Sequence, residues 1–346
     1  MSERRWNPQL REWVITATHR QDRTFLPPAD YCPLCPTRPG SAPTEIARPD
    51  YDIVVFQNKF PSLMPHPPEP AIAGTELTPV APSYGECEVV VYTSQHDATL
   101  SDASLRRLRH LIGVWAHRTF ELGGREGVEY VFVFENKGEA IGVTLNHPHG
   151  QIYAYPTIPP LLQREVAAAR DHRADGAGCL WCELVEQETR DGRRIVAETP
   201  TWQAVVPFFA RWPYEVHLTS RRHIGWLYEM ERQEVDDLAR ILKTVLVKYD
   251  QLFGFSLPYI MALHQRPTDG ADHESFHLHI ELYPPNRTER KLKYLAGSET
   301  GAGAFINDTL PEETAERLRE LAPRDPCELM DEAELVDDAG RPMVGG

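Results

Sequence analysis

The sequence lacks the features that would place the chain in a membrane, in a secretory pathway or on a nucleic acid. No uninterrupted apolar run approaches the roughly 20 residues of a membrane-spanning helix, and residues 1–5 lead into no apolar signal-peptide core. Basic residues are in deficit, with 36 lysines and arginines against 51 aspartates and glutamates and a formal net charge of −15. We therefore expect a cytoplasmic protein whose partners are neither membranes nor nucleic acids.

Cysteine is scarce, and its placement is informative. Four of the six cysteines form two Cys-x-x-Cys pairs, Cys32 with Cys35 and Cys179 with Cys182. Where no secretory signal is present, such pairs favour metal binding over disulfides. The 30 prolines indicate many rigid loops and few long helices.

The second half of the chain repeats the first. Each half has a Cys-x-x-Cys pair, strand-like runs, one amphipathic helix and a late histidine-rich strand; 53 residues separate His96 from His149, and 54 separate His223 from His277. We predict an α+β fold in which a duplicated unit forms one continuous, mostly antiparallel sheet. The predicted domains are residues 1–160 and 161–322, followed by an acidic tail, 323–346, that we expect to be disordered.

Local signals predict several elements. Trp6 to Ile15 is expected to form a hairpin around Asn7-Pro8, and residues 61–85, with seven prolines, a long surface loop. Ser101 is expected to cap a helix that ends at Gly123-Gly124. The apolar face of this helix comprises Leu105, Leu108, Ile112 and Trp115.

The segment His147-Pro148-His149-Gly150-Gln151 carries the strongest chemical signal. Residues two apart on a strand point to the same face, so two imidazoles and an amide would share one small volume. Such a cluster is costly without a ligand, although polar surface on an edge strand is an alternative. Cys32 and Cys35 need two more ligands for tetrahedral zinc, and His96 and His147 are the natural pair; a pair of reduced buried thiols is the alternative.

The second half offers two further metal-ligand sets. Cys179, Cys182 and His223 supply three ligands, but the repeat places Ser275 where His147 would lie, which leaves the fourth ligand open. A separate cluster supplies nitrogen and oxygen ligands that either zinc or iron accepts: His264, His277, His279 and Glu281, with Glu165 as a further candidate.

Phe134-Glu135-Asn136-Lys137-Gly138 followed by His-Pro-His-Gly-Gln resembles the galactose-1-phosphate uridylyltransferase family, a branch of the histidine-triad superfamily. The match covers nearly the whole chain. Gln151 stands where the hydrolases of the superfamily carry a third histidine. The resemblance implies an α+β homodimer of histidine-triad-like repeats with a large antiparallel half-barrel. It also implies a ping-pong exchange of UDP-glucose and galactose 1-phosphate for glucose 1-phosphate and UDP-galactose.

The resemblance also assigns roles to residues. His149 would attack the α-phosphorus to give a uridylyl-histidine, and Gln151 would bind the phosphoryl oxygens. Cys32, Cys35, His96 and His147 fall on structural zinc ligands. Substrate-binding positions are Arg20, Arg23, Asn58, Phe60, Asn136, Gly142, Thr144, Lys293, Tyr294 and Glu299.

A second zinc or iron site in some members maps onto Glu165, His264 and His279, with Glu281 in place of those members' histidine. From the residues alone, Arg20 and Arg23 are either solvated surface or a phosphate clamp. Two rival functions stay open: a nucleotide phosphorylase of the same superfamily that passes an adenylyl group to phosphate, and a zinc-stabilised nucleotide-binding protein without turnover.

Overall fold

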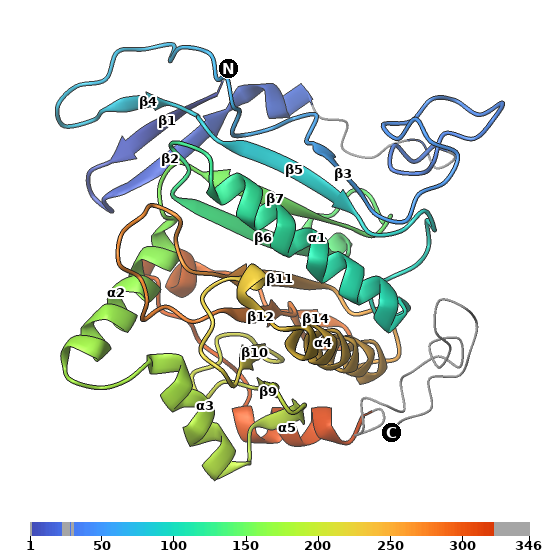
Figure 1. Cartoon of the computed structure of the whole chain (residues 1–346), viewed down its shortest axis with the longest axis vertical. Coiled ribbons are helices and arrows are strands. Elements are labelled where there is room, and N and C mark those ends of the chain that lie inside the picture. Colours follow the sequence, from blue (N-terminus) through green and yellow to red (C-terminus); the bar gives the residue numbers. More distant parts are fainter. Residues whose placement is uncertain (1, 23–27, 29–30, 322–346) are drawn as a thin grey trace.

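The computed structural model describes residues 2–22, 28 and 31–321, and its main feature is one large sheet with helices packed on it (Figure 1). Every neighbouring strand pair in this nine-stranded sheet is antiparallel. The predicted α+β fold with one continuous sheet is confirmed. In spatial order the strands are β3 (Val54–Gln57), β5 (Glu86–Val91), β7 (His149–Tyr155), β6 (Tyr130–Lys137), β11 (Tyr259–His264), β12 (His279–Tyr283), β10 (Val216–Ser220), β9 (Trp202–Val205) and β8 (Ile195–Glu198).

The strand order reveals the duplication. From the centre outward, β6, β7, β5 and β3 of the first repeat are answered by β11, β12, β10 and β9 of the second. The two central strands β6 and β11 pair from Lys137 opposite Tyr259 to Val133 opposite Leu263. The repeats are thus joined edge to edge. The domain boundary between residues 160 and 161 stays a prediction.

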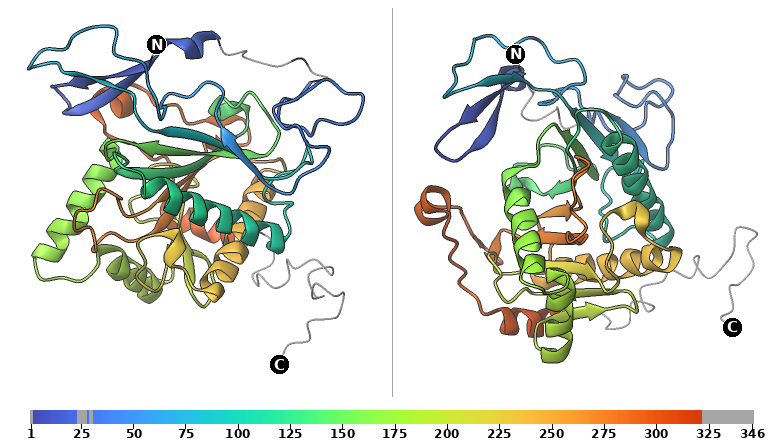
Figure 2. Two further views of the ribbon diagram at one scale, coloured as in Figure 1. Left: turned by 45° about the horizontal axis from the view of Figure 1, so that its top comes forward. Right: turned by 60° about the vertical axis from the view of Figure 1, so that its left-hand side comes forward.

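Helices cover both faces of the sheet (Figure 2). On one face, α1 (Leu105–Gly123) and α4 (Arg232–Leu252) enclose a core that takes Ile152 from β7 and Ile280 from β12. On the other face, α2 (Pro160–Ala174) and α3 (Leu180–Asp191) pack against Tyr130 and Phe276. The alternate residues of β7 and β12, among them the histidines, therefore point away from the α1/α4 core.

Helix α1 begins three residues later than predicted. Its N-cap is Ser104, whose hydroxyl accepts a hydrogen bond from the Arg107 amide, whereas Ser101 donates to Asp250 and belongs to the preceding turn. The expected cap at Ser101 is wrong because two serines satisfy the same local signal. The expected apolar face and the end at Gly123 are confirmed.

The N-terminal segment forms a separate three-stranded sheet. β1 (Ser2–Asn7) and β2 (Glu12–Ala17) make the predicted hairpin, and β1 also pairs with β4 (Val80–Pro82), so the stretch expected to be a surface loop contains a strand. The C-terminal part contributes β13 (Asn286–Thr288), β14 (Lys291–Leu292) and α5 (Pro311–Arg319). The tail at 323–346 lies outside the described residues.

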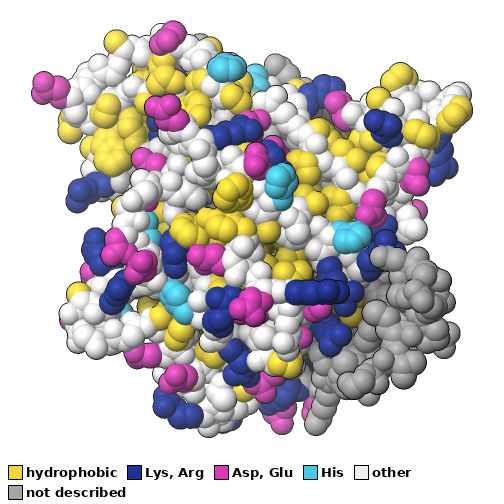
Figure 3. Space-filling model, in the orientation of Figure 1, with side chains coloured by type: hydrophobic (Ala, Val, Ile, Leu, Met, Phe, Trp, Pro, Cys, Tyr) yellow, Lys and Arg dark blue, Asp and Glu magenta, His cyan; other side chains and the backbone are white. Residues whose placement is uncertain are grey.

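The surface over α1 and α4 mixes charges of both signs. Figure 3 shows acidic and basic side chains interspersed over this face, rather than gathered into a basic stripe. Ion pairs such as Arg109–Asp236 and Arg222–Glu234 link them. Among the helices of the described ranges, none is both long and apolar enough to cross a bilayer.

Candidate active site and metal-binding clusters

Strand β7 brings the predicted catalytic residues to one face. His149 is its first residue, and β7 lies between β5 and β6, so the edge-strand alternative is wrong. Ile152 and Ala154 of this strand enter the core under α1. The alternate residues His149 and Gln151 therefore point to the opposite face, as the spacing predicts.

The four residues predicted to bind zinc lie together. Their ligand atoms are all within 4.8 Å of one another. Cys35 Sγ lies 3.5 Å from Nδ1 of His96 and 3.6 Å from Nδ1 of His147. Tetrahedral zinc holds a thiolate sulfur and an imidazole nitrogen about 3.6 Å apart, given its ordinary bond lengths. The donor set and its spacing both fit zinc.

The ring of His147 is fixed on its other side as well. Its Nε2 lies 2.7 Å from the carbonyl oxygen of Thr93, and its side chain is buried. Donation to that carbonyl places the lone pair on Nδ1, toward the cysteines. Burial lowers the pKa of His147 and favours the neutral, ligating form.

His149 is oriented by the chain beside it. Its Nδ1 lies 2.8 Å from the carbonyl oxygen of His147. In the neutral ring, donation to this carbonyl puts the lone pair on Nε2, which is the nucleophilic nitrogen. Fixing His147 therefore also restrains the ring of His149, because that ring is hydrogen-bonded to the His147 carbonyl.

The amide of Gln151 is also held in one orientation. Its Oε1 accepts hydrogen bonds from Asn58 Nδ2 at 3.3 Å and from the Tyr153 hydroxyl at 3.2 Å. Because both donors bind the oxygen, the amide NH₂ is the end that can donate to a phosphoryl oxygen.

Two cavities meet at His149. One, of about 280 Å³, is lined by Asn58, Phe60, Thr144 and Gln151, all predicted site residues. The other, of about 360 Å³, is lined by Asn136 and by His147. A nucleophile between two cavities can receive both sides of a phosphoryl-transfer substrate.

The remaining predicted site residues lie in different surroundings. Arg20 approaches the Tyr153 hydroxyl, next to Gln151, whereas Arg23 is outside the described residues. Gly142 ends a short turn at positive φ near the second cavity.

The loop after β14 lies apart from both cavities. Lys293 is buried and pairs with Glu299 at 3.1 Å, and Tyr294 is 72% exposed. None of these three lines either cavity in the described part of the chain.

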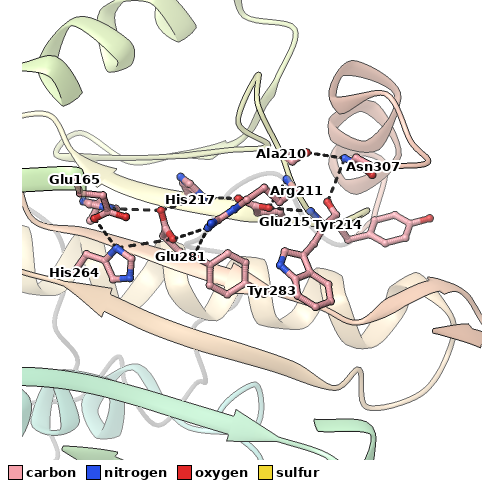
Figure 4. A network of polar contacts seen from close by, with 12 residues as sticks. Glu165, Ala210, Arg211, Tyr214, Glu215, His217, His264, Glu281, Tyr283 and Asn307 are labelled. Carbon is pink, nitrogen blue, oxygen red and sulfur yellow. Dashed lines mark hydrogen bonds and ion pairs between the residues drawn. The ribbon is translucent and has the colours of Figure 1, made fainter. Parts of the chain in front are cut away.

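The residues of the histidine–glutamate cluster of the second repeat lie together, and Figure 4 shows Glu165, His264 and Glu281 of this cluster facing one another. Glu165, His264, His279 and Glu281 offer ligand atoms within 4.8 Å of one another. His264 Nδ1 lies 3.0 Å from Glu165, and His279 Nε2 lies 3.5 Å from Glu281. Imidazoles oppose the effect of burial and hold the pKa of Glu281 well below its usual range. Paired carboxylates and imidazoles of this kind can ligate zinc or iron.

Sequence reasoning missed the outer part of this cluster. His217 on β10 lies 3.4 Å from Glu281 and 2.8 Å from Glu215, while Arg211 lies 3.6 Å from Glu281. The alternation of polar and apolar residues in Glu215-Val216-His217 could have indicated that Glu215 and His217 share one face of a strand. The partner across the sheet was not visible in the sequence.

The second Cys-x-x-Cys pair has a fourth neighbour that the repeat alignment assigned incorrectly. His277, not Ser275, lies with Cys179, Cys182 and His223, and all four ligand atoms are within 4.8 Å of one another. The alignment was wrong by two residues, because His277 corresponds to His147 and His279 to His149 in the sheet. His277 therefore leaves the histidine–glutamate cluster.

Comparison with known proteins covers both repeats. Residues 1–159 match the family described as galactose-1-phosphate uridyl transferase, N-terminal domain. Residues 165–327 match the C-terminal domain of the same enzyme. The chain belongs to the galactose-1-phosphate uridyl transferase family. The resemblance inferred from the motifs is confirmed.

Relatives in this family align over nearly the whole chain. The galactose-1-phosphate uridylyltransferase of Thermotoga maritima is 41% identical over 323 residues, 92% of this chain and 98% of the relative. That of Streptomyces lividans is 39% identical, over 93% of this chain and 87% of the relative.

Solved structures agree. A uridylyltransferase aligns with a TM-score of 0.82 at 37% identity, covering 92% of this chain and 97% of the other. An ADP-glucose phosphorylase from Arabidopsis thaliana shares the fold, with a TM-score of 0.69 at 22% identity over 93% of this chain and 99% of the other.

Proposed function

We propose that this protein transfers a uridylyl group from UDP-glucose to galactose 1-phosphate through a covalent intermediate on His149. The observation that carries the proposal is the oriented pair on β7. His149 presents Nε2 on the face where the Gln151 amide is held by Asn58 and Tyr153. Relatives named for this activity align over 92% of the chain.

In the first half-reaction, Nε2 of His149 attacks the α-phosphorus of UDP-glucose. The N–P bond forms as the P–O bond to glucose 1-phosphate breaks, and the leaving group takes the electron pair. The positive charge on the uridylylated ring is stabilised by the His147 carbonyl, which accepts from Nδ1–H.

In the second half-reaction, a phosphate oxygen of galactose 1-phosphate attacks the same phosphorus and releases the imidazole as UDP-galactose forms. Gln151 donates to the phosphoryl oxygens in both steps but is not a general base. Water is therefore not activated, and an acceptor that is already an anion is favoured.

We propose a structural role for the metal ions. Cys32, Cys35, His96 and His147 would hold a zinc ion, whose role is to fix the loop, His147 and thereby His149. Glu165, His264, His279 and Glu281 would hold a second zinc or iron ion, and the two carboxylates there suit either metal.

We further propose a homodimer in the cytoplasm, with substrate-binding roles for the positions that the family resemblance assigns. Exposed apolar side chains on the loop after β14 support the dimer: Tyr294 is 72%, Leu295 50% and Ile306 58% exposed. Residues 1–160 and 161–322 are proposed as the two repeats, which share one sheet.

Incubation with UDP-glucose labelled at the α-phosphate tests the activity. We expect acid-labile, base-stable label on His149, chased by galactose 1-phosphate, and none on a His149→Ala protein with unchanged metal content. Parallel incubation with ADP-glucose and free phosphate tests the phosphorylase alternative. Label on another residue, or full transfer by His149→Ala, would refute the proposal.

A further inference from the structure

The second repeat contains a copy of the first cysteine–histidine cluster, and the proposed function does not use it. Cys179 is the residue before α3 and Cys182 lies in its first turn. His223 follows β10, and His277 lies two residues before β12. These elements meet because β10 and β12 are neighbours in the sheet.

The distances in this cluster fit tetrahedral zinc. Nδ1 of His277 lies 3.5 Å from Sγ of both Cys179 and Cys182, and Nδ1 of His223 lies 3.9 Å from Sγ of Cys182. Zinc bond lengths place a sulfur and a nitrogen ligand about 3.6 Å apart.

The surroundings of His277 repeat those of His147. The Ser220 hydroxyl lies 2.8 Å from Nε2 of His277, just as the Thr93 carbonyl holds Nε2 of His147. Both rings thus turn Nδ1 toward two cysteines. An outer hydrogen bond of this kind orients a metal-ligating imidazole.

We propose that Cys179, Cys182, His223 and His277 bind a further structural zinc ion, distinct from the metal of the histidine–glutamate cluster, so that each chain carries two thiolate-ligated zinc ions. Two thiolates and two neutral imidazoles balance the charge of Zn²⁺, and the two thiol protons leave to solvent on binding. Four protein ligands leave no open coordination position, which makes the site structural.

The zinc ion would hold α3 against the sheet next to His279, the residue of the second repeat that corresponds to His149. Trp181, between the two cysteines, stacks on His279 with ring centroids 5.0 Å apart. His279 is 1% exposed, and its Nδ1 lies 2.9 Å from the His277 carbonyl oxygen. The second repeat has thus kept the metal framework while its equivalent of His149 is closed off from solvent.

Cobalt substitution tests the proposal. Zinc is removed and replaced by Co²⁺, and absorption from thiolate-to-cobalt charge transfer is measured per chain. We expect the double variant Cys179→Ala/Cys182→Ala to lose about half of the wild-type intensity, and Cys32→Ala/Cys35→Ala to lose the other half. Cys87→Ala, a buried cysteine outside both clusters, should lose none. The histidine–glutamate cluster has no thiolate and does not contribute.

A second measurement needs no variant. A mercurial thiol reagent added to the native protein should release two zinc ions per chain. Release of one ion, or unchanged cobalt absorption in Cys179→Ala/Cys182→Ala, would overturn the proposal. Neither readout depends on uridylyl transfer, so the two proposals can fail separately.

Discussion

At the scale of single residues, two hydrogen bonds orient the Gln151 amide near the proposed nucleophile. Asn58 and Tyr153 both bind its oxygen, so its NH₂ is aimed before substrate binds. Such a preorganised donor acts mainly on the transition state. Gln151→Ala should therefore lower kcat about 100-fold with little change in KM for UDP-glucose. Steady-state kinetics check this, with the exposed Gln57→Ala as the matched control; an unchanged kcat would contradict it.

Glu135 gives a pH prediction. This β6 carboxyl is buried, and burial raises its pKa to about 8 from an ordinary 4.5 despite Lys137 nearby. The folded protein keeps the proton that the unfolded chain loses. Stability is therefore full below about pH 4.5 and falls as pH rises to about 8, by about 1.4 kcal/mol per pH unit.

Urea unfolding across this range checks the expectation. Glu135→Gln should flatten the decline and be more stable than wild type in alkaline buffer. The exposed Glu139→Gln should follow the wild-type curve. A Glu135→Gln protein that declines as steeply as wild type would show that another group is responsible.

The placement of the individual site residues was largely readable from the sequence, whereas their chemical roles stay predictions. The two-residue spacing of His147, His149 and Gln151 predicted one face, and β7 places two of them there. The same spacing in Glu215 and His217 indicates a polar face, but it could not link His217 to Glu281, which is 64 positions further along the chain. Only the pairing of β10 with β12 places them opposite one another.

At the scale of elements, the proposed zinc site would hold the loop that carries Cys32 and Cys35. This segment has no strand or helix between residues 31 and 53, and turn hydrogen bonds and a single bridge between Pro36 and Ile46 hold its backbone. Zinc binding then contributes directly to its folding free energy.

Cys32→Ser should remove one zinc ion per chain and lower the melting temperature, at a cost on the order of several kcal/mol. Metal analysis and calorimetry measure both effects. Cys87→Ser serves as the control, because it changes a buried thiol outside the cluster. Unchanged zinc content in Cys32→Ser would remove the ligand assignment.

Element positions could be predicted where periodicity is strong, as in α1, and less well where loops vary in length. The incorrect match of Ser275 with His147 shows the limit of comparing intervals along the chain. Matching His96–His149 with His223–His277 gave nearly equal intervals, yet the true counterparts, His147 and His277, stand at different intervals from His96 and His223. Loop insertions change such intervals at little energetic cost. Strand alternation, which loops do not affect, identifies the correct pairs.

At the scale of the whole molecule, the duplicated repeats share one sheet and one core. β6 pairs with β11, and the core under α1 and α4 takes side chains from both halves. The sequence indicated the duplication, but not which strands would join, because pairing partners leave no periodic signal.

Residues 1–160 expressed alone should therefore aggregate, since the β6 edge and the apolar underside of α1 would be exposed. Co-expression with residues 161–346 should restore a soluble, paired protein. Size-exclusion chromatography and circular dichroism distinguish the cases. A soluble, cooperatively folded 1–160 fragment would mean that each repeat is an independent domain.

The interior position of β7 has a kinetic consequence. Because β7 is flanked by β5 and β6, His149 cannot move between one binding site for the donor sugar phosphate and another for the acceptor. Under the proposed reaction, incoming and outgoing hexose phosphates must take turns at the same place. Each sugar phosphate is then expected to inhibit its counterpart competitively, so the rate in either direction will depend on the ratio of the two.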